Sequence, residues 1–89
     1  MRAVLTVVGR DKVGIVAGVS QTLAQLQFNI VDMSQTIMQG NFTMMLMCEL
    51  SATDVDFEPI RAQLNQLGQQ LGVQIRIQRE EIFDTMHKI

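Results

Sequence analysis

The chain has 89 residues, of which 47% are hydrophobic, and a formal net charge of −2. This length suffices for one domain with a modest core. The mixed charge, with four Phe and no Trp or Tyr, argues against a nucleic-acid partner, which needs a basic face or stacking aromatics. A single Cys48 and a single His87 argue against a disulfide and a structural zinc site. Neither a membrane span nor a signal pattern is found, so we expect a cytoplasmic protein without a membrane partner.

The first predicted element is a strand over residues 2–8, because these residues are mostly β-branched or aliphatic. Gly9 ends this strand, and a polar loop leads to Gly14. Helical spacing of apolar residues then predicts a helix from about residue 14 to 27. The apolar positions assigned to its buried side step by three, four and three: Val16, Val19, Leu23 and Leu26.

Two strands joined by a short turn are predicted next. Residues 29–39 nearly alternate between apolar and polar, which places Ile30 on the same face as Asp32. Residues 39–41 form the turn, since Gly and Asn tolerate positive φ. Residues 42–50 form the next strand. Its predicted core face consists of Phe42, Met44, Leu46, Cys48 and Leu50.

The remaining chain predicts a helix, a strand and a short tail. An apolar stripe from Phe57 to Leu71 predicts the helix, with Gly72 just past its end as a left-handed cap. Residues 73–78 alternate and predict the strand. Residues 81–89 fit an amphipathic helical tail, whose apolar positions are Ile82, Phe83, Met86 and Ile89.

The order βαββαβ is the split βαβ, or ferredoxin-like, arrangement of the α+β class. Right-handed crossovers put both helices on one face of a four-stranded antiparallel sheet, with the expected strand order 4-1-3-2. The second strand then lies at an edge. We therefore expect one domain over residues 1–80, followed by the tail.

The loop from Arg10 to Gly14 is the first candidate for binding a small polar molecule. Amide groups at a helix start bind carboxylates, and Asp11 can meet an ammonium group. The alternative is an ordinary polar loop in which Asp11 caps the helix. Asn29, the second candidate, opens the next strand, where an Asn is usually structural. Gly14 and Asn29 lie about 20 Å apart along the helix, so a two-fold dimer with these helices antiparallel would bring them together.

Other groups of residues carry weaker signals. A Cys48–His87 nucleophile pair is disfavoured, because Cys48 belongs to a core face and His87 to the tail. Asp54, Asp56 and Glu58 suit a helix start better than a metal site. Methionines gather in the middle of the chain, and core filling with an interface explains them better than a soft metal site: Met33, Met38, Met44, Met45 and Met47.

Two runs of residues resemble an ACT domain. These are DKVGIVA at residues 11–17 and NIVD at residues 29–32. The resemblance extends over residues 1–80 and is strongest to the branch found in the glycine cleavage system transcriptional repressor and in formyltetrahydrofolate deformylase. It implies regulatory binding of small molecules, most often amino acids, at the interface between two such domains. The ligand-binding residues that it implies are Asp11, Lys12, Val13, Gly14, Ile15, Asn29, Ile30 and Val31.

The match to serine-binding members of that family is partial. Asn29 and Gly14 match the pattern, while Asp11 stands where those members have a binding Asn. Gly9 stands where they have a His, and Val13 replaces a frequent proline. The resemblance therefore implies an amino-acid ligand without selecting one.

The expected function is that of a homodimeric regulatory module, without catalytic residues, metal or cofactor, that acts on an unknown target protein. One alternative is a dimerisation or interaction module without a ligand, for which the apolar tail and the edge strand are suitable. Another is a small ferredoxin-like enzyme such as an acylphosphatase. Arg10 and Asn41 are its nominal residues, but the loop lacks a glycine-rich phosphate cradle.

Overall fold

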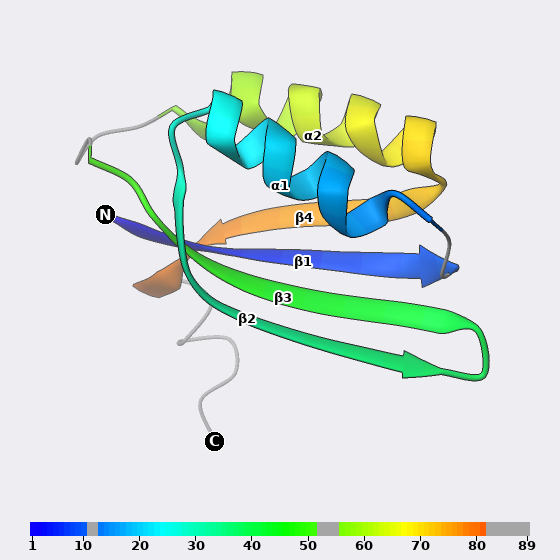
Figure 1. Cartoon of the computed structure of the whole chain (residues 1–89). Coiled ribbons are helices and arrows are strands. Elements are labelled where there is room, and N and C mark those ends of the chain that lie inside the picture. The colour runs from blue at the N-terminus through cyan, green and yellow to red at the C-terminus, as the bar shows by residue number, and fades with distance from the viewer. Residues whose placement is uncertain (11–12, 52–55, 82–89) are drawn as a thin grey trace.

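A computed structural model of the chain describes residues 1–10, 13–51 and 56–81. Its four strands form one antiparallel sheet in the order β2-β3-β1-β4, and both helices lie on the same face (Figure 1). The α+β ferredoxin-like fold and the predicted strand order are therefore confirmed. The tail predicted over residues 81–89 lies outside the described residues except for Glu81. The elements are β1 (Arg2–Arg10), α1 (Ile15–Gln25), β2 (Asn29–Met38), β3 (Asn41–Glu49), α2 (Phe57–Leu71) and β4 (Val73–Arg79).

The core fills the space between the helices and the sheet. The predicted core face of β3 is buried as expected, from Phe42 to Cys48, and Leu50 continues it beyond the strand. From the helices, Leu23 and Leu64 are almost fully buried. Burial raises the pKa of the Cys48 thiol from 9.0 to about 11, because the thiolate would lose its hydration. Cys48 is therefore a packing residue without nucleophilic character.

The buried side of α1 differs from the predicted one. Ile15, Val19 and Leu23 face the sheet at a constant spacing of four, whereas Val16 is 36% exposed. Leu26 caps the helix and is only partly buried. Both sets of positions satisfy a helical period of 3.6, so periodicity alone does not fix the rotation of the helix. The consequence is an apolar valine left on the exposed side of α1.

A β-bulge in β2 corrects the predicted alternation of that strand. Ile30 pairs with Cys48, and the register shifts before Asp32 pairs with Met47. The extra residue, Val31, returns Met33 to the side of the sheet on which Ile30 lies. Ile30 and Asp32 therefore lie on opposite faces, contrary to the sequence prediction. The carboxylate of Asp32 accepts a hydrogen bond from the amide of Met33 at 2.9 Å, which supports the bulge.

Local features define both ends of α2. Asp56 is its N-cap, and its carboxylate accepts a hydrogen bond from the amide of Glu58 at 3.0 Å. Gly72 ends the helix with a φ of 73°, as the sequence predicts. Within the helix, Gly68 lies against β4 so closely that an added Cβ would stand 2.6 Å from the carbonyl oxygen of Val73. The C-terminal half of α2 is thus held directly onto β4.

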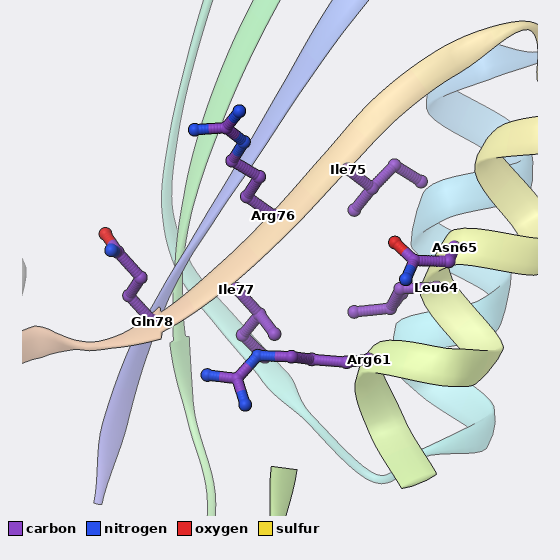
Figure 2. A pocket seen from close by; sticks show the side chains of 7 residues that line it. All are labelled: Arg61, Leu64, Asn65, Ile75, Arg76, Ile77 and Gln78. Carbon is purple, nitrogen blue, oxygen red and sulfur yellow. The ribbon is translucent and has the colours of Figure 1, made fainter. Parts of the chain in front are cut away.

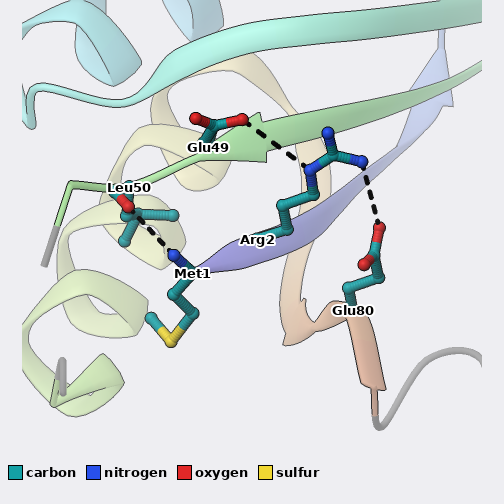
Figure 3. A network of polar contacts seen from close by, with 5 residues as sticks. All are labelled: Met1, Arg2, Glu49, Leu50 and Glu80. Carbon is teal, nitrogen blue, oxygen red and sulfur yellow. Dashed lines mark hydrogen bonds and ion pairs between the residues drawn. The ribbon is translucent and has the colours of Figure 1, made fainter. Parts of the chain in front are cut away.

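Polar contacts join the end of the sheet at which β1 begins (Figure 3). The N-terminal ammonium of Met1 donates to the carbonyl of Leu50 at 3.1 Å. The guanidinium of Arg2 lies 3.7 Å from Glu49 and 3.8 Å from Glu80. These contacts connect β1, β3 and the residues that follow β4. Because the Arg2 and Glu49 side chains are about half exposed, we attribute little stability to that pair.

Candidate functional site

The start of α1 carries the first half of the candidate site. Gly14 is the N-cap, with a φ of 96°, a backbone conformation that residues other than glycine rarely adopt. No side-chain group among the described residues caps this end, and the first turn has no acidic residue. Among the described residues, the first amides of α1 therefore have no side-chain partner, and this helix end is partly positive. Asp11 and Lys12, which the sequence places beside it, lie outside the described residues.

The two residues that flank Gly14 have opposite environments. Val13 is fully exposed, while Ile15 is 1% exposed and packs in the core. Ile15 can therefore present only its backbone to a ligand and anchors the helix through its side chain. Val13 remains available as an apolar contact at the rim of the site.

The start of β2 carries the second half of the site. Asn29 is the first residue of the strand, pairs with Glu49 and is exposed. Ile30 is partly buried and packs against the core, so its side chain serves the fold. Val31 occupies the bulge and is 41% exposed. Of these three residues, Asn29 alone offers a polar side chain to a ligand.

The two halves of the site lie at opposite ends of α1 (Figure 1). Eleven residues at 1.5 Å each give α1 a length of about 16 Å. The register agrees: Arg10, just before the Gly14 loop, pairs with Asn41, which pairs with Met38 at the end of β2. Asn29 lies at the other end of that strand. A single copy of the chain therefore does not bring Gly14 and Asn29 together.

An exposed apolar surface runs between the two half-sites along β2. We call it the β2 edge surface and define it by Val31 (41% exposed), Met33 (48%), Ile37 (52%) and Met38 (67%). Met33 and Ile37 pair with the buried Leu46 and Phe42, so they lie on the helix-bearing face of the sheet. The helices leave both residues uncovered, whereas Met38 pairs with Asn41 and lies on the opposite face at the end of the strand. The alternation of apolar and polar residues in β2 indicated this surface in the sequence, but the bulge shifts that alternation by one residue.

Of the described residues considered for enzymatic chemistry, the structure brings only Arg10 and Asn41 together. Arg10 and Asn41 are brought opposite each other by the β1–β3 register, beside an open hollow of about 610 Å³. The hollow's other lining residues are apolar, glycine or glutamine, with no carboxylate, imidazole or thiol among the described ones. Cys48 is buried, and His87 lies outside the described residues. Arg10 and Asn41 therefore meet without a general acid or base.

The methionines are divided between the core and a hollow of about 200 Å³ beside β2 and β3, which Met33, Met45 and Met47 line. Met44 is completely buried in the core, while its neighbour Met45 is 36% exposed on the opposite face of the sheet. Over residues 1–10, 13–51 and 56–81, no three His, Cys, Asp or Glu residues are arranged to hold a metal ion. In the same part of the chain, no helix has the length and apolar character needed to cross a membrane.

Comparisons with known proteins agree on one family. A family model described as an ACT domain matches residues 2–78. A UPF0237 protein of Listeria monocytogenes is 61% identical over 89 residues, covering all of both chains. The solved ACT domain protein from Streptococcus pneumoniae has a TM-score of 0.85 and 46% identity, over 94% of each chain. A structure provisionally assigned as a glycine cleavage system transcriptional repressor has a TM-score of 0.75 and 27% identity, over 88% of this chain and 44% of that one.

Proposed function

Because the chain belongs to the ACT domain family, we propose that it is a regulatory module that works as a homodimer. Each dimer binds small molecules of the amino-acid class between its two copies. The module carries no catalytic residue of its own and acts in the cytoplasm on a target protein. Its response is a change in the stability or geometry of the dimer.

The β2 edge surface is the observation that supports a dimer. Among the described residues, β2 has a hydrogen-bonded strand neighbour on one side only, so its other side has no strand partner there. Apolar side chains stand on the same strand, and its single charged residue, Asp32, is already engaged by the amide of Met33. A second copy that adds its own β2 would satisfy the backbone and remove this apolar area from water.

The direction of β2 relative to α1 supports a ligand site at this interface. A two-fold axis between two β2 strands makes them antiparallel, so the Asn29 end of one strand meets the Met38 end of the other. The Met38 end is also the Gly14 end of the same copy. Each of two equivalent sites then combines the start of α1 with Asn29 of the partner subunit.

An amino acid suits such a site chemically. Its carboxylate would accept hydrogen bonds from the first amides of α1, where the helix dipole is positive. Asp11 would meet its ammonium group, and the partner's Asn29 would hydrogen bond to either group. Because each ligand touches both copies, binding stabilises one arrangement of the interface over others, which is the requirement for regulation.

The test combines a mass measurement with a ligand screen. Sedimentation equilibrium at micromolar concentration should give the mass of a dimer. Thermal unfolding in the presence of each of the twenty amino acids should then show a raised Tm with one of them. A ligand at about 100 times its Kd adds about 2.7 kcal/mol, which raises the Tm by roughly 10–20 °C for a domain of this size. A monomer would contradict the proposal.

A dimerisation module without a ligand is the second function supported by the β2 edge surface. It predicts the same dimer and no change of Tm with any of the twenty amino acids. The screen therefore separates the two functions, while the mass measurement tests what they share.

A further inference from the structure

The other edge of the sheet carries a trough along β4 (Figure 2). Two adjoining hollows, of about 260 and 370 Å³, share Asn65, Ile75 and Arg76 and together follow β4 from Val73 to Gln78. α2 forms the opposite wall of the trough. β4 pairs only with β1, so its far side has no strand partner among the described residues. We call this feature the β4 trough.

The two sides of the β4 trough differ in chemistry. On the helix side, Leu64, Ile75 and Ile77 form an apolar wall. Arg76 and Gln78 alternate with these isoleucines and point away from α2 (Figure 2). A strand laid beside β4 would alternate in the same way, with one face toward the isoleucines and the other toward Arg76. An alternating apolar and acidic sequence fits both faces.

The charged residues that line the two hollows are both cationic, although the whole chain has a net charge of −2. They are Arg61 and Arg76, whereas the nearby acidic residues, Asp56, Glu58, Glu80 and Glu81, lie at or beyond the ends of α2 and β4 and line neither hollow. The guanidinium groups of Arg61 and Arg79 each lie 5.7 Å from the centre of the buried Phe57 ring, which gathers both at one end of β4. Glu58 contacts Arg61 at 3.1 Å, but its side chain is 79% exposed and screens only part of this charge.

A second copy of the chain is a poor occupant for the β4 trough. β4 has seven residues, and Arg76 is the fourth of them. A centred two-fold pairing of two β4 strands would therefore set Arg76 opposite itself. Like charges directly opposite each other destabilise a strand pair. The position of Arg76 thus favours a strand of different sequence that carries negative charge.

We propose that the β4 trough binds an extended acidic segment of a partner protein, which adds to the sheet beside β4. The backbone of the segment pairs with the side of β4 that faces away from β1, as in β-strand addition. Its apolar side chains contact Ile75 and Ile77, and its carboxylates contact Arg76, with Arg61 at one end. This surface is on the opposite edge from β2 and does not depend on the proposed ligand or dimer.

The probe is a blocked, fluorescein-labelled peptide of nine residues that alternates glutamate and valine. Fluorescence anisotropy should show binding that weakens as salt is added. A matched peptide with lysine in place of glutamate should bind at least about tenfold more weakly. Amide resonances perturbed by the acidic peptide should map to β4 and α2, and hydrogen exchange should slow at amides on the side of β4 that faces away from β1.

Variants test the role of the arginine. Arg76→Glu should weaken binding of the acidic peptide by about tenfold or more and improve binding of the lysine peptide. Thr36→Glu, which adds a negative charge at the β2 edge of the sheet, is the control and should leave both affinities within about twofold. Equal binding of the two peptides, perturbations that map to β2, or no binding of the acidic peptide at about 1 mM would each overturn the proposal. The two-peptide comparison uses the unaltered protein, so it stands even if a variant fails to fold.

Discussion

The two edges of this sheet have opposite surfaces. β2 exposes four apolar side chains and has one charged residue, whose carboxylate is engaged within the strand. β4 buries its apolar residues under α2 and carries an arginine at its centre. An edge strand invites pairing unless something prevents it. From this comparison we infer that β2 is suited to pair with a second copy of itself. β4 is poorly suited to such pairing, and we propose that it binds a strand of opposite charge.

The largest expected effect comes from placing a charge on the β2 edge. Ile37→Glu should make the protein monomeric, because each copy loses about 1.5–3 kcal/mol of apolar burial and gains a carboxylate at the interface. Both copies carry the change, so the dimer Kd should rise by roughly 100-fold or more. Sedimentation equilibrium measures this directly.

Thr36→Glu is the matched control for that variant. Thr36 is exposed and pairs with Thr43 on the face of the sheet without helices. The added charge should therefore change the dimer Kd far less than Ile37→Glu does. Equal loss of the dimer in both variants would show that any charge on β2 acts alike and that the apolar surface is not the cause.

A smaller effect is expected from removing the charge on the other edge. Arg76→Val takes away the like-charge opposition at the centre of β4 and adds a side chain suited to strands. The dimers should then associate further through β4, and the weight-average mass should rise with concentration, with association strengthened by about tenfold. Gln74→Val, on the same face of β4, keeps Arg76 and should leave the mass that of a dimer.

The ligand site gives the third prediction. Asn29→Ala removes one hydrogen-bonding side chain from each composite site, which costs about 1 kcal/mol, or roughly fivefold in ligand affinity. The rise in Tm caused by the amino acid found in the screen should shrink accordingly. Asn65→Ala, beside β4, is the control and should keep the full rise. An unchanged rise in the Asn29 variant would remove this residue from the site.

A pH effect is expected from the sheet interior that both edges share. The pKa of Cys48 is raised from 9.0 to about 11, so the folded state holds the thiol proton more tightly than the unfolded state. This contribution to stability is complete below pH 9 and is lost as the pH rises toward 11. The free energy of unfolding should fall over that range by up to about 3 kcal/mol more than in Cys48→Ala. Equal slopes would mean that Cys48 titrates normally.

The sequence predicted the fold because periodicity and turn residues agree along the chain. Gly72 and the alternation of residues 73–78 located the end of α2 and the start of β4. Periodicity did not determine the rotation of α1, since Ile15 and Val16 both fit a helical stripe. Nor did it anticipate the bulge at Val31, because one extra residue in a strand leaves the local alternation almost unchanged.

The candidate site was predictable only in part, and for a different reason. Gly14 and Asn29 were singled out from the chain, and the structure places Gly14 at the start of α1 and Asn29 at the exposed start of β2. Their separation along α1 also followed from helix geometry. The β4 trough was not anticipated, because it depends on where α2 lies beside Arg76, which involves residues far apart in the sequence.

The central claim is that the start of α1 in one copy meets the start of β2 in the other. A double variant, Val13→Cys with Asn29→Cys, tests it by oxidation and non-reducing electrophoresis. Within one copy these positions lie at opposite ends of α1, about 16 Å or more apart, whereas a disulfide requires Cα atoms within about 7 Å. We expect a covalently linked dimer band for the double variant and only the band of the single chain for each single variant. If the double variant forms no disulfide between chains under oxidation, the start of α1 in one copy does not meet the start of β2 in the other.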